Sequence, residues 1–229
     1  MDTALDMALQ ANDLYHIYDA SQVRTVALRG AQMGLARGTW TVLMGPSGSG
    51  KSTLLHIIAG LLNPSAGSVV SGGVDVTRLP PSARANWRRR NVGLVLQRDN
   101  LHPHLDVAGN IALPLRLQRL AAGEIHARVQ ALLGQVGLQD RGQHRAGQLS
   151  GGEAQRAAIA TALSTRPAVL LADEPTGELD EATAAGILDL LAGLARQGMA
   201  ILTVTHNQQV AQRASHHLVM HDGMVTDAR

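Results

Sequence analysis

The stretch GPSGSGKST, at residues 45–53, has the residue types and spacing of a loop that binds nucleotide phosphates. It fits G-x-x-x-x-G-K-[ST], between an apolar strand pattern and an apolar helix pattern. The backbone amides of such a loop wrap a polyphosphate, its lysine reaches the β and γ phosphates, and the next hydroxyl ligates Mg²⁺. The predicted nucleotide-binding residues are Gly45, Pro46, Ser47, Gly48, Ser49, Gly50, Lys51, Ser52 and Thr53. A flexible glycine turn is the alternative, although Lys51 is the only lysine in an arginine-rich chain.

Two acidic residues follow the apolar segment AVLLADEP at residues 168–175. Such a segment is typical of a buried strand, and ligands of α/β proteins bind at the carboxyl ends of these strands. We assign Asp173 to the coordination of Mg²⁺ and Glu174 to polarising an attacking water. A kinase would have less use for the second acid, because its phosphate acceptor is not water. Two exposed acids without a catalytic role are the other alternative.

Single polar residues end two further apolar segments, NVGLVLQ at 91–97 and MAILTVTH at 199–206. Gln97 and His206 would therefore reach the same edge of a parallel sheet. A glutamine amide can bridge Mg²⁺ and the water, and a histidine can hold the γ phosphate, although either residue could be structural. The predicted catalytic residues are Glu174, Gln97 and His206. The predicted Mg²⁺ ligands are Ser52, Gln97 and Asp173.

The alanine-rich helix pattern LSGGEAQRAAIATAL, at residues 149–163, begins with two adjacent glycines. Ser150 and Glu153 fit the S-x-x-E capping box, in which each side chain caps a backbone amide of the first turn. Alanines at 151 and 152 would satisfy that cap equally well, and glycine costs about 1 kcal/mol in a helix. Gly151 and Gly152 therefore indicate that something approaches the bare amides, and an anion is the natural candidate.

Buried strand patterns alternate with helix patterns in most of the chain, which predicts a largely parallel α/β sheet. The strands are expected at 39–45, 91–97, 168–173 and 199–206, with helices at 51–62 and 181–198. Short antiparallel strands are expected at 8–18 and 25–33, and hairpins at 67–76 and around 222–223. Residues 98–165 have no strand signal and are expected to form an inserted helical lobe, with helices at 106–120, 123–138 and 149–163. The α/β core with its β subdomain would then comprise 1–97 and 166–229 of one domain.

Composition excludes several classes of function. The 229 residues include no cysteine, which excludes disulfides, thiol catalysis and cysteine-bound metal. The net charge is +2, with a pI of 9.6, and aromatic residues are scarce, so nucleic acid is not an expected partner. The Arg88–Arg90 cluster is interpreted as a solvated helix end or loop. No secretion signal or membrane-spanning run is recognisable, and the chain is expected to be soluble.

With these motifs in order, the chain resembles the ATPase subunits of ABC transporters over essentially its whole length. The family's motifs correspond to the P-loop GPSGSGKS, the glutamine loop at Gln97, the signature LSGGE, the Walker B segment VLLADE, the D-loop GELD at 177–180 and the switch histidine His206. The resemblance implies a P-loop NTPase (RecA-like) core, ATP and Mg²⁺ as ligands, and hydrolysis of ATP to ADP and phosphate.

The same resemblance implies a head-to-tail homodimer in which the signature of one copy covers the γ phosphate held by the P-loop of the other. Ser150, Gly151 and Gly152 would then contact ATP bound mainly by the second copy. Tyr18 matches the position at which the family stacks an aromatic ring on adenine, with Tyr15 as the fallback. The other implied partners are integral membrane permease subunits, at the cytoplasmic face of the inner (plasma) membrane.

Within the family, the motifs look most like those of lipoprotein-release and macrolide-exporter ATPases, which implies export, lipoprotein release or mechanotransmission across the cell envelope. Departures from the usual pattern occur at Leu96, Ala154, Thr161, Glu178 and Asn207. A soluble ABC-type ATPase not coupled to transport is the alternative, but it would need a long coiled-coil insertion or a second ATPase half. A P-loop kinase would leave LSGGE unexplained.

Overall fold

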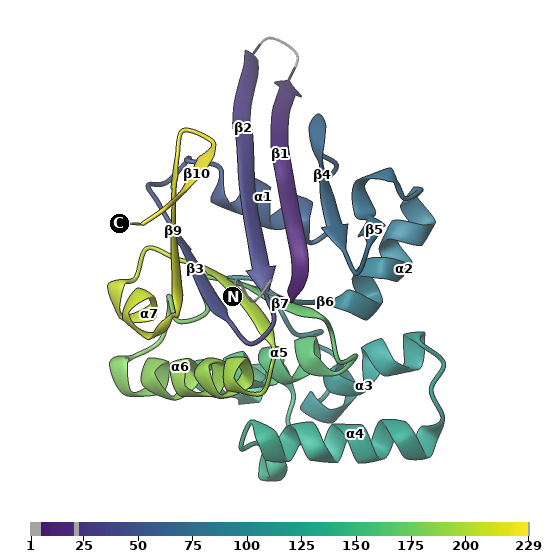
Figure 1. The fold of residues 1–229 in the computed structure, drawn as a ribbon. Helices are drawn as coiled ribbons and strands as arrows, with labels where there is room; N and C mark the ends of the chain where they lie inside the picture. Colours follow the sequence, from purple (N-terminus) through teal and green to yellow (C-terminus); the bar gives the residue numbers. More distant parts are fainter. Residues whose placement is uncertain (1–5, 21–22, 229) are drawn as a thin grey trace.

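The computed structural model describes residues 6–20 and 23–228, and its centre is a six-stranded sheet (Figure 1). The strand order is β10 (Met224–Asp227), β9 (His216–His221), β3 (Trp40–Met44), β8 (Ala200–Val204), β7 (Val169–Asp173) and β6 (Val92–Val95). All pairs are parallel except β10 with β9. β8 is buried at every position, as its uninterrupted apolar and β-branched sequence predicts.

A second, antiparallel sheet has the order β2 (Val23–Ala36), β1 (Met7–Ala20), β4 (Ala66–Ser71) and β5 (Val74–Asp75). The prediction of short strands here was wrong, because β1 and β2 each have 14 residues. Irregular pairing interrupts their apolar alternation: Asp13 and Gly30 have positive φ, and the register shifts nearby. The expected hairpin at 67–76 is formed by β4 and β5.

Helix α1 (Lys51–Ile58) packs between the two sheets. Its buried Leu54 and Leu55 join one apolar cluster with Leu9 and Leu28 of the antiparallel sheet and with Leu43 of the central sheet. The helix is shorter than predicted, since the chain turns at Gly60, where φ is +69°. This packing fixes the loop before α1 against both sheets.

Helix α2 (Pro81–Asn91) was not among the predicted helices, and its polar sequence gives only a weak apolar face, with Trp87 buried. The Arg88–Arg90 cluster lies in the last turn of α2, in agreement with its interpretation as a helix end. Arg88 is not merely solvated, because its guanidinium donates a hydrogen bond to the carbonyl oxygen of Gly60 at 2.9 Å.

The remaining helices lie on the other side of the central sheet (Figure 1). Apart from the 3₁₀ turn Val76–Arg78, whose buried Val76 packs in the cluster around α1, they are α3 (Val107–Leu117), α4 (Ala122–Gln135), α5 (Gly151–Leu163), α6 (Glu181–Arg196) and α7 (Gln208–Arg213), with short 3₁₀ turns at Gln139–Arg141 and Ala146–Gln148. Their buried side chains form a second apolar cluster with β3, β6, β7 and β8. In the part of the chain that the structure describes, no helix combines the length and apolar character needed to cross a membrane. The predicted fold class is confirmed.

Candidate nucleotide site

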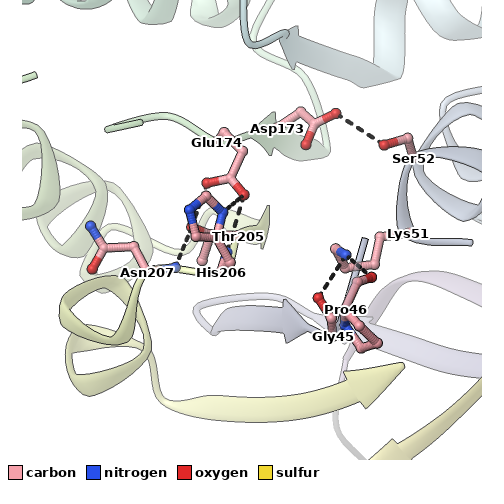
Figure 2. Close-up of polar contacts among 9 residues, drawn as sticks. All are labelled: Gly45, Pro46, Lys51, Ser52, Asp173, Glu174, Thr205, His206 and Asn207. Atoms are coloured by element: carbon pink, nitrogen blue, oxygen red, sulfur yellow. Dashed lines mark hydrogen bonds and ion pairs between the residues drawn. The ribbon is translucent and has the colours of Figure 1, made fainter. Parts of the chain in front are cut away.

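The predicted phosphate loop and the predicted acids meet at the carboxyl edge of the central sheet (Figure 2). Leu43 of β3 and Asp173 of β7 both pair with Val204 of β8, so the three strands end at nearly the same level. The P-loop follows β3, Glu174 follows β7 and His206 follows β8. The sheet register therefore brings together segments that are about 30 to 160 residues apart in the sequence.

Two P-loop glycines are required by packing within the chain. A Cβ at Gly45 would lie 2.2 Å from the carbonyl oxygen of Met220 in β9, and one at Gly50 would lie 2.4 Å from that of Ala27 in β2. Gly48 differs, since its φ is +78° and a Cβ there would meet nothing within 4 Å. Both sheets hold the ends of the loop, while its tip stays open to a ligand.

The Lys51 ammonium lies inside the loop. Its Nζ donates hydrogen bonds to the carbonyl oxygens of Gly45 and Pro46, both at 2.8 Å. An ammonium carries three donors, and the bonds to neutral carbonyls can be exchanged for stronger charge-assisted bonds to phosphate. The Ser49 hydroxyl is buried in the same loop without a hydrogen-bond partner among the described residues.

Ser52 and Asp173 offer oxygen ligands beside the loop. The Ser52 hydroxyl lies 3.5 Å from a carboxylate oxygen of Asp173. Burial raises the pKa of Asp173, and the nearby charge of Glu174 raises it further. A carboxylate that lacks a full countercharge, next to a hydroxyl, fits Mg²⁺, which prefers oxygen ligands and binds through one or two protein groups together with substrate phosphates.

Glu174 points away from Asp173, toward the turn after β8. Its φ of +46° directs the chain out of the strand, and only 14% of its side chain is exposed. One carboxylate oxygen accepts a hydrogen bond from the Thr205 hydroxyl at 2.7 Å. The other accepts from the His206 backbone amide at 3.1 Å and lies 2.6 Å from the His206 Nδ1 (Figure 2).

The structure thus joins Glu174 and His206 directly, a contact that the sequence reasoning did not include. It had also missed Thr205, which orients the Glu174 carboxylate from the position before His206. The only sequence signal for Thr205 is its place at the end of the same apolar segment. Three donors converge on one carboxylate, which therefore has a defined orientation at the edge of the sheet.

Of the two candidate tyrosines, Tyr18 is the one that contacts the P-loop. Its hydroxyl lies 3.3 Å from the Thr53 hydroxyl, and its ring is 43% exposed. Tyr15 is equally exposed, but it has no hydrogen bond to the P-loop in the described part of the chain. Tyr18 can therefore present an aromatic face next to bound phosphates.

The predicted capping box at the start of α5 is present. The Ser150 hydroxyl accepts from the Glu153 amide at 3.3 Å, and Glu153 accepts from the Ser150 amide at 2.8 Å. The Ser150 amide and the Arg141 guanidinium lower the pKa of Glu153 to about 2. Ser150 itself is exposed, so its hydroxyl is open to a further partner.

The two glycines of this turn have different reasons to be glycine. A Cβ at Gly152 would lie 2.2 Å from the Thr183 methyl group of α6, so packing within the chain already requires glycine there. The inference that this glycine indicates an approaching anion was therefore incomplete. Gly151 is exposed, and a Cβ there would lie 3.3 Å from Leu179. Only Gly151 leaves backbone open on the surface of the turn.

Gln97 and the signature residues lie apart from the phosphate loop. Gln97 follows β6 by two residues, is exposed and lines a cleft of about 600 Å³ that is also lined by Gly151 and Glu178. Across this cleft, the Arg98 guanidinium donates to the Glu178 carboxylate at 2.6 and 2.9 Å. Within 6–20 and 23–228, no hydrogen bond joins Gln97 or residues 150–152 to the P-loop.

Comparisons with known proteins agree with this arrangement. A family model described as ABC transporter matches residues 28–177. The chain is 42% identical over 223 residues to the lipoprotein-releasing system ATP-binding protein LolD of Bordetella avium (strain 197N), covering 97% of each chain. It is 40% identical over 219 residues to LolD of Legionella pneumophila (strain Paris), covering 95% of this chain and 96% of the relative.

A solved structure of similar fold is the dimeric, post-hydrolysis ATP-binding cassette MJ0796 bound to ADP and Pi. Its TM-score is 0.87 at 32% sequence identity, and the match covers 96% of this chain and 99% of that chain.

Proposed function

We propose that this chain, which belongs to the ABC transporter family, closes around ATP as a pair of identical subunits and drives a membrane permease. It is an ATP-binding, ATP-hydrolysing subunit of an ABC transporter. The residue assignments depend on two contacts that lie side by side at one edge of the sheet. Ser52 contacts Asp173, and Glu174 contacts His206. These contacts support a phosphate site that also holds a group able to activate water.

Each residue of this edge has a distinct role in the proposal. Lys51 and the P-loop amides hold the β and γ phosphates, and Tyr18 stacks on the adenine. Ser52 and Asp173 would hold Mg²⁺, and Gln97 is the third ligand in this proposal. Bound Mg²⁺ would neutralise phosphate charge.

Glu174 polarises the attacking water, and the contacts of its carboxylate suggest how it is kept ready. Thr205 and the His206 amide hold the carboxylate, and the His206 ring lies against it. When ATP is bound, the His206 ring exchanges this contact for the γ phosphate, which frees one carboxylate oxygen for the water. The loss of the γ phosphate on hydrolysis reverses the exchange.

The second copy supplies the lid of each site. Ser150, Gly151 and Gly152 of one copy would cover the triphosphate held by the P-loop of the other. In the described part of the chain these residues have no hydrogen bond to their own P-loop, which supports such a role. The dimeric form of the MJ0796 cassette supports this arrangement. Hydrolysis removes the γ phosphate that joins the halves, and the dimer opens.

The membrane partners belong to the same proposal. The LolD relatives are named as parts of a lipoprotein-releasing system, which supports lipoprotein release or a related envelope export as the task of this chain. The helical segment 98–165, together with the loop at Gln97, would transmit closure to permease subunits. The chain would then lie peripherally at the cytoplasmic face of the inner membrane.

The first test is Glu174→Gln, which keeps an acceptor oxygen for Thr205 but removes the charge that polarises water. We expect kcat for ATP hydrolysis to fall at least about a hundredfold. We also expect an ATP-bound dimer to accumulate, measured by size-exclusion chromatography with light scattering. Asp189→Asn, the same chemical change at an exposed ion pair of α6, is the matched control. Normal turnover by Glu174→Gln would remove Glu174 from this role.

A further inference from the structure

A buried histidine lies beside Tyr18, the residue proposed to stack on the adenine. His16 and Tyr18 are two residues apart in β1, at a place where the strand pairing shifts register, and their rings are in contact. The ring centroids are 4.6 Å apart, and the ring planes meet at 80°, an edge-to-face arrangement. His16 is only 7% exposed, whereas the Tyr18 ring is at the surface.

Hydrogen bonding from Nδ1 does not explain the choice of histidine at position 16. The Nδ1 atom is buried and has no hydrogen-bond partner among the described residues, although burying a polar atom in this way is unfavourable. An aliphatic residue, such as the buried Leu14 that precedes it in β1, would avoid that cost. A flat ring, however, can make an edge-to-face contact with Tyr18, which an aliphatic side chain cannot.

Tyr18 depends on such contacts for its orientation. It is at the exposed end of β1, and the hydrogen bond from its hydroxyl to Thr53 is long, at 3.3 Å. That bond ties the tip of the ring to the P-loop, and His16 contacts the ring itself. Together, the two contacts fix the plane of the ring relative to the phosphates before a base arrives.

We propose that His16 is a positioning residue that orients the Tyr18 ring for stacking on the adenine of ATP. This inference rests on the proposed role of Tyr18. A preoriented ring loses less rotamer freedom when the base binds, so His16 strengthens the binding of the base without touching it. The contribution is specific to ligands that carry a base, because no hydrogen bond joins either side chain to a P-loop amide among the described residues, and Tyr18 reaches only the Thr53 hydroxyl.

The test compares two probes, MgATP and inorganic tripolyphosphate, by calorimetry on the full chain. We expect His16→Val to raise the Kd for MgATP about three- to tenfold, the range of one aromatic pair, and to leave tripolyphosphate binding unchanged. His16→Phe keeps an aromatic ring and should restore the affinity for MgATP to within about twofold. Ile17→Ala, at the exposed position between the two rings, is the matched control and should change neither Kd.

A double variant separates this inference from the proposed function. Tyr18→Ala should weaken MgATP binding, and adding His16→Val to it should weaken it no further, because there is no ring left to orient. If Tyr18→Ala alone left MgATP binding unchanged, the stacking role of Tyr18 and this inference would both be wrong.

Two other results would overturn the inference alone. One is a weakened Tyr18→Ala variant beside an unaffected His16→Val variant. The other is an equal loss of affinity for MgATP and tripolyphosphate in His16→Val, which would indicate a general structural role for His16. Failure of His16→Phe to restore MgATP binding would indicate the same structural role. Thermal unfolding of each variant without ligand identifies any that fold poorly. If His16→Val is one of them, the Kd for MgATP of His16→Phe is compared with that of Tyr18→Ala instead.

Discussion

The P-loop edge of the sheet and the first turn of α5 are both parts of the proposed ATP site, yet they differ in how far one chain completes them. At the edge, Asp173 contacts Ser52 of α1 and Glu174 contacts Thr205 after β8, so both acids have partners from distant segments. At the turn, the hydrogen bonds of Ser150 are local, to Glu153 three residues away. The edge is assembled by the sheet, whereas the turn has an exposed glycine and, among the described residues, no hydrogen bond to the P-loop.

Under the proposed function, the two regions would bind the same ligand in different ways. Residues at the edge are held by parallel strands whose ends are level, so the fold orients them before ATP binds. In the proposed dimer, residues of the turn act on the ATP that the other copy holds. The binding of ATP and its hydrolysis should therefore be separable by mutation, with binding sensitive to the edge and hydrolysis sensitive to both.

The largest expected effect comes from the edge. Lys51→Ala removes an ammonium that would make charge-assisted bonds to two phosphates, so we expect the Kd for MgATP to rise at least about a hundredfold. Hydrolysis at cellular ATP concentrations should be lost with it. Equilibrium binding of a fluorescent ATP analogue checks this, with Arg196→Ala at the exposed end of α6 as the control. Unchanged binding would show that the P-loop does not hold the triphosphate.

The turn should give the opposite pattern. Gly151→Asp adds a negative charge to the exposed glycine, so we expect hydrolysis to fall at least about tenfold while the Kd of the monomer for ATP stays within about twofold. Steady-state phosphate release and binding to the isolated monomer measure the two quantities.

Mixing the Lys51→Ala and Gly151→Asp proteins sharpens the comparison. In a mixed dimer, the intact P-loop of the Gly151→Asp chain faces the intact turn of the Lys51→Ala chain, which restores one complete site. We expect the mixture to hydrolyse ATP faster than either protein alone. If the mixture forms dimers but stays inactive, either the turn of one copy does not cover the site of the other, or hydrolysis requires two intact sites in each dimer. The activity of a tandem-linked dimer with one intact site distinguishes these two explanations.

Gly152 tests whether the turn is built by packing as well as by ligand binding. Gly152→Ala gains about 1 kcal/mol of helix propensity but places a Cβ against the Thr183 methyl group, and overpacking of this kind costs about 1–3 kcal/mol. We expect a net loss of about 1 kcal/mol in the free energy of unfolding, measured with urea. Adding Thr183→Ser removes the methyl group and should recover the loss. Equal stability of wild type and Gly152→Ala would contradict the packing explanation.

The smallest expected effect is on stability at Asp173. Its raised folded-state pKa means that the folded protein holds this proton more tightly than the unfolded chain, so the residue lowers stability as pH rises above the ordinary carboxyl range. Asp173→Asn should therefore raise the melting temperature of the nucleotide-free protein at neutral pH, on the order of 2 °C. The difference should shrink as the pH falls toward about 4. If the difference in melting temperature did not change with pH, the titration of Asp173 would not be its cause.

Much of the site was predictable because its motifs are short. Lys51 and Ser52 are separated by fixed steps along the chain from the glycines that shape the loop, and the Ser150–Glu153 cap spans a single helical turn. The central strands were predictable because β7 and β8 are buried on both faces and have uninterrupted apolar sequences. The 14-residue β1 and β2 were not, because bulges break the alternation by which such strands are recognised.

The sequence alone determined which chemical groups this protein has and the order in which they occur. A phosphate loop, two acids after an apolar strand and a glycine pair at a capped helix follow from local propensities and spacing. Tertiary structure decided which groups meet: Glu174 with His206, Tyr18 rather than Tyr15 with Thr53, and Gly152 with Thr183. These contacts join residues that are far apart in the chain, so they depend on strand register and helix packing, which no local pattern specifies.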